Sequence, residues 1–297
     1  RHAPLQAPEV GLAERPDLPV RKLLPAAVAA LVLLAVAVAN RDLLSGRATP
    51  SFRDLATTQR PARALAASLG GAALNPHASF GQPYRGNPNL VLAYPFPAAP
   101  RWLGLHLLLH AAIGGLGFLL FLRLLGRSPE AALAGALAFS FSGFALSCTA
   151  FLNSATTLAW VPWLLASVAA ARLEGRRAIR LALLGSAASG ALLAHAGEPA
   201  LGLIGILLAL AVALAGPFGT RLRATGALLG GGLLALLASA PFLLEVLRAT
   251  EASSRRLRGF SWSEFSAVGF HPLRLLETPF PFLFGDPSRV LSGAYWG

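Results

Sequence analysis

The chain has 297 residues, of which 55% are hydrophobic and only 13% are charged, and its mean hydropathy is +0.60. Soluble domains carry about 25% charged residues, so this composition excludes an ordinary soluble domain and indicates an integral membrane protein. The formal net charge of +12 comes almost entirely from arginine. Because the arginines fall between apolar runs, membrane topology and anionic lipid explain this charge better than nucleic acid does.

The first 40 residues predict a tail followed by a membrane-spanning helix. Residues 1–22 are polar, contain proline and lack periodicity, so we predict a cytoplasmic tail there. The apolar run at 23–40 predicts the first span. The flanking Arg21 and Lys22 place the N-terminus on the cytoplasmic side.

A long polar segment, residues 41–101, follows the first span. It holds a weakly amphipathic stretch at 52–69 and then a stretch rich in Gly, Pro and Asn that cannot form a long helix. The segment carries seven arginines but only two acidic residues, Asp42 and Asp54. Its length and its content of Tyr, Phe and Asn predict an ordered, functional loop rather than a plain linker.

Six further apolar runs predict an all-α, polytopic protein with about seven spans, in a transmembrane domain at 23–246. They cover 102–122, 131–151, 156–171, 181–195, 200–215 and 224–246. The turns after the second, fourth and sixth spans are rich in arginine, whereas the turns after the third and fifth contain none. The positive-inside rule therefore places loop 41–101, the turns near Asn153 and 195–198, and the segment 247–297 on the outer face.

Residue types within the spans give two smaller predictions. Trp160 and Trp163, near the start of the fourth span, are predicted to anchor it at the membrane interface. Two groups of closely spaced glycines indicate close helix packing, namely Gly114, Gly115 and Gly117, and Gly230, Gly231 and Gly232.

Asp54 is the first candidate for chemistry, and two interpretations are open. A carboxylate in an arginine-rich loop suits a general base for an acceptor hydroxyl, with arginines stabilising a phosphate leaving group. Alternatively, Asp54 is a solvated loop residue that pairs with Arg53 or caps the following helix. Composition alone favours this second interpretation.

Three other polar residues also have two interpretations each. Glu198 is either a functional carboxylate at membrane depth or a cap for the helix that Pro199 begins. His106 and His110 have the i,i+4 spacing of metal ligands, but no third ligand is evident, so a packing role is favoured.

The motifs of nucleotide-binding loops and of serine hydrolases are absent from the sequence.

Several segments in the same order resemble the bacterial YfhO-type membrane proteins, which are among the GT-C-type glycosyltransferases. FRDLATTQRP at 52–61 is similar to the family's Asp-x(n)-Gln-x-x-Pro region, and GGAALNPHASFGQPYRGNPNLVLAYPFP at 70–97 resembles its proline-rich loop. LNSATTLAWVPWLL, LLAHAGEPALG and FPFLFGD continue the match to the end of the chain. Where relatives often have Gly-His-Pro, this chain has Gly197–Glu198–Pro199.

The resemblance implies a GT-C-like fold and an inverting transfer of sugar from a polyprenyl-phosphate donor to a cell-envelope polymer or glycolipid on the outer face of the bacterial cytoplasmic membrane. It implies that Asp54 is the catalytic base and that this chain is the N-terminal portion of a longer protein, with 247–297 incomplete. The expected substrate-binding residues are Arg53, Gln59, Arg60, Tyr84, Arg85, Asn87, Tyr94 and Glu198.

The expected partners are the lipid-linked sugar, the acceptor and membrane lipids, and nucleic acid is not among them. The sequence indicates no cofactor or metal site and leaves a divalent-metal requirement open. Two other function classes also stay open, a transporter of lipids or lipid-linked precursors and a non-catalytic envelope assembly protein. The scarcity of charge within the spans argues against the transporter.

Overall fold

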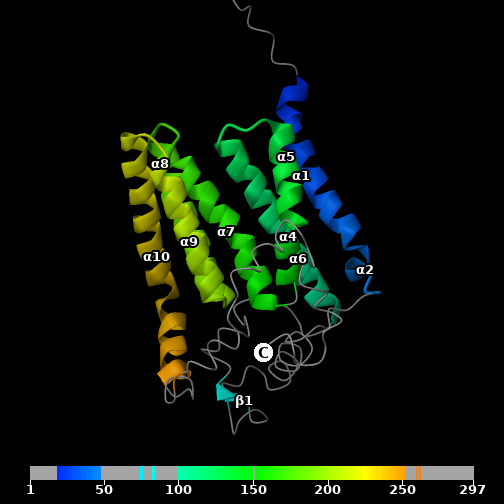
Figure 1. The fold of residues 1–297 in the computed structure, drawn as a ribbon, viewed down its shortest axis with the longest axis vertical. Coiled ribbons are helices and arrows are strands. Elements are labelled where there is room, and N and C mark those ends of the chain that lie inside the picture. The colour runs from blue at the N-terminus through cyan, green and yellow to red at the C-terminus, as the bar shows by residue number, and fades with distance from the viewer. Residues whose placement is uncertain are drawn as a thin grey trace, which may run out of the picture. The chain divides into compact units, whose positions relative to one another are not determined.

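The computed structural model describes residues 19–47, 74–75, 82–83, 100–149, 151–251, 259 and 261. This part of the chain is almost entirely helical, which confirms the all-α class (Figure 1). The helices are α1 (Pro19–Ala39), α2 (Arg41–Leu44), α4 (Pro100–Leu124), α5 (Pro129–Ser140), α6 (Gly143–Cys148), α7 (Leu152–Ala170), α8 (Arg176–Ala196), α9 (Pro199–Leu214) and α10 (Phe218–Glu251). Two short antiparallel strands, β1 (Leu74–Asn75) and β2 (Gln82–Pro83), pair in the register Leu74 to Pro83.

The chain divides into two compact units, and the boundary falls within α10, between Leu243 and Leu244. The second unit contributes the last turns of α10 to the described residues, together with Gly259 and Ser261. The packing, cavities and side-chain contacts discussed below all belong to the first unit.

Within the described residues, three helical segments are long and apolar enough to cross a membrane, namely Leu103–Leu124, Arg176–Ala196 and Phe218–Glu251. Two shorter apolar segments, Ala26–Ala39 and Pro199–Leu214, accompany them. These helices give the chain the character of a membrane protein. The total of seven spans and the GT-C-like arrangement stay predictions.

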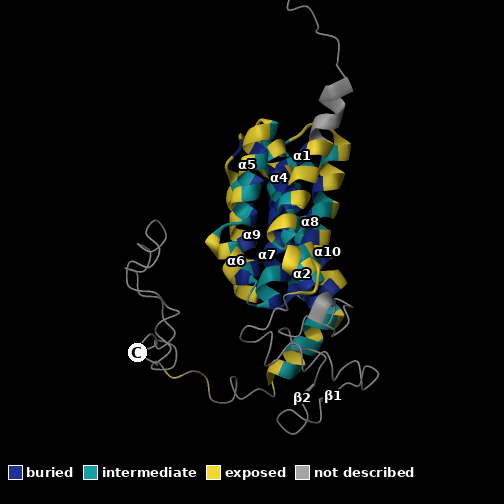
Figure 2. Cartoon of the chain, turned by 90° about the vertical axis from the view of Figure 1, so that its right-hand side faces the viewer, coloured by how far each residue is buried: buried dark blue, intermediate teal, exposed yellow. Residues whose placement is uncertain are grey.

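Helix α7 lies at the centre of the first unit and is surrounded by α4, α6, α8 and α9, while α1 packs on α4 and α5 (Figure 1). More than half of its residues are buried, including Leu158, Leu164 and Val168. The helices at the periphery instead expose large apolar side chains, and Figure 2 shows how exposed and buried residues alternate along them. Leu229 is 67% exposed and Leu237 is 64% exposed, so a lipid surrounding suits this surface better than water.

The predicted span 131–151 forms two helices rather than one, because α5 ends before Phe141 and α6 begins after Ser142. Ser142 explains the break. Its hydroxyl accepts the Ala145 amide at 3.1 Å and donates to the Phe139 carbonyl at 3.0 Å, which caps the new helix while closing the old one. The polar side chains in this stretch therefore serve the backbone at a break that hydropathy alone did not reveal.

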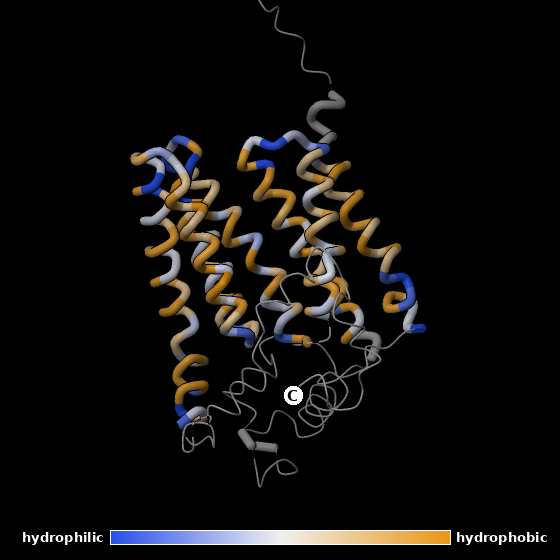
Figure 3. The backbone as a smooth tube through the Cα atoms, in the orientation of Figure 1, coloured by the Kyte–Doolittle hydropathy of each residue, from blue (hydrophilic) through white to orange (hydrophobic). Residues whose placement is uncertain are grey.

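The turns alternate between the two ends of the helical bundle as the arginine pattern predicts. The α4–α5, α7–α8 and α9–α10 turns lie at the same end of the bundle, and Figure 3 shows this end as hydrophilic. Its arginines are Arg123, Arg127, Arg172, Arg176, Arg177, Arg180, Arg221 and Arg223. At the other end lie α2, α6, the start of α7 and the α8–α9 turn. Which end faces the cytoplasm stays a prediction.

The glycine groups permit the close helix packing that the sequence indicates. A Cβ added at Gly115 would stand 2.6 Å from the Ser140 hydroxyl oxygen, and one at Gly231 would stand 2.5 Å from the Ser186 Cβ. Both distances are shorter than van der Waals contact, so any larger residue would separate the helices. Gly232 is the exception, with no atom within 4 Å of its added Cβ.

Candidate functional site

Eight of the nine predicted site residues lie outside the described residues, and their placement stays a prediction. They are Arg53, Asp54, Gln59, Arg60, Tyr84, Arg85, Asn87 and Tyr94. The end of α2 and the start of α4, which flank this segment in the chain, both lie at the end of the bundle opposite the arginine-rich turns. Leu43 of α2 packs there on α4, with its Cβ 3.4 Å from the point where a Cβ on Gly104 would stand.

Glu198, the ninth predicted residue, lies at this same end and joins the α8–α9 turn to the first turn of α7. Its Oε2 accepts the Asn153 side-chain amide at 2.9 Å and the Ser154 hydroxyl at 3.3 Å. The Asn153 amide also donates to the Gly197 carbonyl at 3.3 Å. Two of the four segments that the sequence predicts on one face, the turns near Asn153 and 195–198, are therefore in direct contact.

The local sequence explains why the chain turns sharply at Glu198. Gly197 ends α8 with φ of +86°, in the left-handed region that favours glycine, and Pro199 begins α9 with its fixed φ. Glu198 occupies the N-cap position of α9, but its side chain makes no capping hydrogen bond. Glu198 therefore lies at the positive end of α9 as the capping interpretation expects, but its carboxylate accepts hydrogen bonds from α7 rather than from the first amides of α9.

A second polar cluster, formed by His106, His110 and Thr156, lies buried between α4 and α7. Thr156 donates its single hydroxyl proton to the Leu152 carbonyl at 2.7 Å, so its oxygen must accept from His106 Nε2 at 2.9 Å. His110 donates from Nδ1 to the His106 carbonyl at 2.8 Å. The two rings stack with centroids 4.0 Å apart.

These contacts support the packing interpretation of the histidine pair. The His106 ring binds α7 through Thr156, and the His110 ring meets Trp160 edge-on at 6.3 Å between centroids. Within the described residues, no group of three or more His, Cys, Asp or Glu side chains could hold a metal ion. The i,i+4 spacing correctly predicted that the two histidines share one face of α4. The sequence did not show that this face packs against Thr156 of α7.

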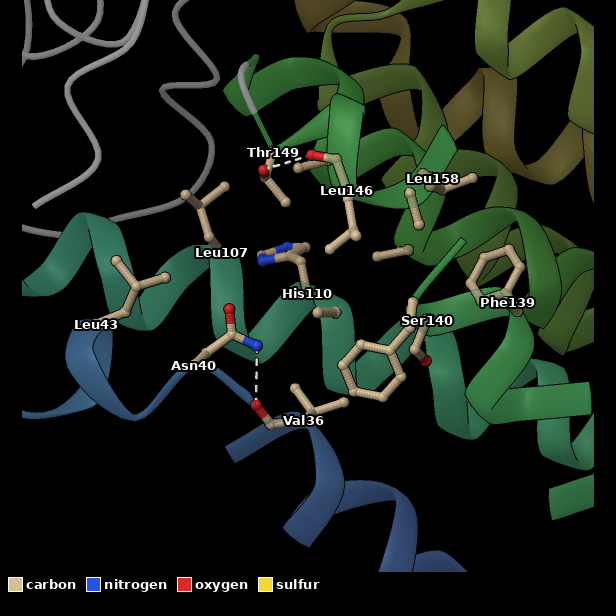
Figure 4. Close-up of a pocket in the computed structure, with 16 residues that line it drawn as sticks. Val36, Asn40, Leu43, Leu107, His110, Phe139, Ser140, Leu146, Thr149 and Leu158 are labelled. Carbon is tan, nitrogen blue, oxygen red and sulfur yellow. Dashed lines mark hydrogen bonds between the residues drawn. The ribbon is translucent and has the colours of Figure 1, made fainter. Parts of the chain in front are cut away.

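The His110 ring also forms part of the wall of a partly open cavity of about 380 Å³ that residues of α1, α2, α4, α5, α6 and α7 line. Figure 4 shows the ring between Leu107 and Leu158, with Asn40 and Ser140 on neighbouring walls. Asn40 donates its amide to the Val36 carbonyl at 2.8 Å, which leaves its carbonyl oxygen as an acceptor. A mostly apolar cavity with a few polar groups suits a small or chain-like apolar ligand.

Comparison with known proteins finds no matching family model, no matching curated protein and no matching solved structure. The resemblance to YfhO-type proteins therefore rests on the order of the sequence motifs alone, and the activity that it implies is a proposal.

Proposed function

We propose that this chain forms part of a membrane glycosyltransferase that moves a sugar from a polyprenyl-phosphate donor to a cell-envelope acceptor. The observation that supports it most is the gathering of polar groups at one end of the bundle. Glu198 with its two donors, and the cavity beside His110, lie at the end where Arg47 and Pro100 flank the segment that carries Asp54. The proposal includes about seven spans, a GT-C-like arrangement and a cytoplasmic N-terminus in the bacterial inner membrane.

In the proposed reaction, Asp54 takes the proton of an acceptor hydroxyl while the hydroxyl oxygen attacks the anomeric carbon of the donor sugar. The bond from that carbon to the phosphate oxygen breaks, and the polyprenyl phosphate leaves with the electron pair. Arg53, Arg60 and Arg85 stabilise the charge that develops on the phosphate. This single displacement inverts the anomeric centre and needs no covalent enzyme intermediate.

The other predicted residues complete the proposed binding site. Tyr84 and Tyr94 offer aromatic faces on which a sugar can stack, and Gln59 and Asn87 offer amides to its hydroxyls. Glu198 holds the α8–α9 turn against α7 through Asn153, so in this proposal it shapes the acceptor side without transferring a proton.

The test is transfer of radiolabelled sugar from a polyprenyl-phosphate sugar in membranes that contain the full-length protein. Asp54→Asn removes the base while it keeps the size of the side chain, and we expect transfer to fall by about a hundredfold or more. Asp42→Asn is the matched control, because Asp42 is the other acidic residue of the segment and is exposed on α2. Its replacement should leave transfer within about twofold of the wild type. Unchanged transfer in a stably inserted Asp54→Asn protein would contradict the catalytic role.

A transporter of lipid-linked precursors is the second candidate, and the mostly apolar cavity beside His110 favours it. The same Asp54→Asn protein separates the two functions. A transporter would still move a fluorescent lipid-linked sugar between the leaflets of reconstituted vesicles and would show no sugar transfer even as the wild type. An assembly protein would show neither activity and would tolerate Asp54→Asn in cells.

A further inference from the structure

Two arginines from separate parts of the chain flank the α9–α10 turn, at the arginine-rich end of the bundle. Arg172, two residues after the end of α7, donates from Nη2 to the Val212 carbonyl. Arg221, in the first turn of α10, donates from Nε to the Gly216 carbonyl. Arg172 Nε lies 3.8 Å from the point where a Cβ on Gly216 would stand, so both guanidinium groups flank the same turn.

The charge of this arginine pair is not neutralised by a carboxylate within the described part of the chain. Arg172 Nε is buried and makes no hydrogen bond there, and no ion pair joins either guanidinium to Glu174, the acidic residue nearest to Arg172 in sequence. A guanidinium group has five N–H donors, and each of the two has one engaged by a carbonyl. A guanidinium group without a carboxylate partner can bind an anion through its remaining N–H donors.

Large apolar side chains adjoin the arginine pair in sequence and are exposed. Phe218 is 74% exposed, Leu222 is 62% exposed, and Leu173 and Leu214 are about half exposed. Leu173 follows Arg172 in the chain, Leu214 ends α9, and Phe218 and Leu222 belong to the first turns of α10. An anionic ligand that also covers this apolar surface would bury area that a free anion leaves exposed.

We propose that Arg172 and Arg221 bind the phosphodiester headgroup of an anionic phospholipid, whose acyl chains lie along the exposed side chains of Phe218 and Leu222. The planar guanidinium groups match phosphate oxygens in a bidentate way, which a single ammonium group does not. Arg172 also stabilises the carbonyl end of α9, and Arg221 stabilises the turn that follows it. That role uses only one donor of each and leaves the other N–H groups for the lipid.

The experiment titrates phosphatidylglycerol or phosphatidylcholine onto the detergent-purified full-length protein and measures bound lipid by native mass spectrometry. Arg172→Gln and Arg221→Gln are informative because glutamine keeps an N–H donor for the carbonyl but loses the charge and the fork. Arg127→Gln is the matched control, since it removes the same charge from the exposed α4–α5 turn at the same end.

We expect the wild type to prefer phosphatidylglycerol, each single change at Arg172 or Arg221 to weaken that binding about fivefold, and the double change to weaken it about twentyfold. Arg127→Gln should change it less than about twofold. An equal loss with Arg127→Gln would overturn the proposal in favour of diffuse electrostatic attraction. Displacement of the lipid by glycerol phosphate would also overturn it, because the ligand would then be a free phosphate.

Thermal stability of the unmodified protein provides a measurement that does not depend on how the variants fold. Phosphatidylglycerol should raise the unfolding temperature, whereas phosphatidylcholine at the same concentration should not. Equal stabilisation by both lipids would contradict a site that recognises an anionic headgroup. None of these measurements involves Asp54, so a failure here is distinct from a failure of the proposed enzymatic activity.

Discussion

The interfaces α4–α7 and α8–α10 both depend on glycine, yet they are built differently. In α4–α7 the close approach at Gly117 is combined with short hydrogen bonds between the helices. His106 Nε2 donates to Thr156 at 2.9 Å, and the Trp163 indole donates to the Ile113 carbonyl at 2.8 Å. These directional bonds determine which residue of α4 lies opposite which residue of α7.

The α8–α10 interface has the close approach with much less polar contact. Gly231 lies against the backbone of α8, where an added Cβ would stand 2.8 Å from the Leu183 carbonyl oxygen. Ser239 of α10 and His195 of α8 form a long polar contact, with 3.5 Å between the Ser239 hydroxyl oxygen and His195 Nδ1. The comparison indicates that packing of small residues holds α10 against α8. At the α4–α7 interface, beside the cavity at His110, hydrogen bonds also determine which residues face each other.

The strongest way to break the α8–α10 interface is Gly231→Ala. The new Cβ would overlap Ser186 Cβ, the Leu183 carbonyl oxygen and the Ala187 amide nitrogen, and two of these are backbone atoms that no side-chain rotation can move. We expect a loss of about 3 kcal/mol in the free energy of unfolding. Thermal unfolding of the detergent-purified protein, followed by circular dichroism, measures it.

Gly232→Ala is the matched control one residue along the same helix. Its added Cβ meets no atom within 4 Å, so alanine should improve helix propensity by up to about 1 kcal/mol and raise the unfolding temperature. If both alanines destabilise the protein equally, close approach at Gly231 is not what holds α10.

On the α4–α7 side, Gly117→Ala should have the next largest effect. Its Cβ would stand 2.6 Å from Trp163 Cδ1 and 3.1 Å from Pro162 Cβ. The indole can shift only by lengthening its hydrogen bond to the Ile113 carbonyl. We expect a loss of about 2 kcal/mol, less than at Gly231 because the clashing atoms belong to side chains.

The environment of Trp163 reports this change directly. Displacement of the indole should alter tryptophan fluorescence in Gly117→Ala, whereas Gly231→Ala should leave the emission of the folded protein unchanged. A Gly117→Ala protein with wild-type emission and stability would show that the α4–α7 interface is looser than its geometry indicates.

Sequence patterns predicted the parts of the fold that depend on composition and period. Arginine-rich turns alternate with arginine-free ones, and this alone placed Asn153 and Glu198 at one end of the bundle. It could not predict that their side chains meet at 2.9 Å, because that distance depends on how α7 packs against the α8–α9 turn. The resemblance pointed first to Asp54, which lies outside the described residues, so the most specific sequence prediction is also the one without a structural account.

One sequence prediction differs from the structure for a physical reason. The predicted span 131–151 is broken because Ser142 uses its hydroxyl to cap a new helix, an effect that a hydropathy average does not register. The placement of Trp160 and Trp163 at the membrane interface stays a prediction. The structure adds that both contact α4, where Trp163 donates to the Ile113 carbonyl.

The finest test of the comparison uses two neighbouring threonines of α7, Thr156 and Thr157, both fully buried. The Thr156 hydroxyl accepts from His106 and donates to the Leu152 carbonyl. The Thr157 hydroxyl is buried without a hydrogen-bond partner in the described part of the chain. Valine matches threonine in shape, so each change to valine isolates the contribution of one hydroxyl group.

Thr156→Val removes an acceptor from a buried imidazole N–H, and we expect the free energy of unfolding to fall by about 1 kcal/mol. Thr157→Val removes a hydroxyl that already lacks a partner, so the protein should be unchanged or more stable by up to about 1 kcal/mol. Thermal unfolding of both variants under the same detergent conditions gives the difference. If the two variants change the free energy of unfolding equally, the burial of the threonines determines that energy and their hydrogen bonds do not. The α4–α7 interface would then be held by packing alone, like α8–α10.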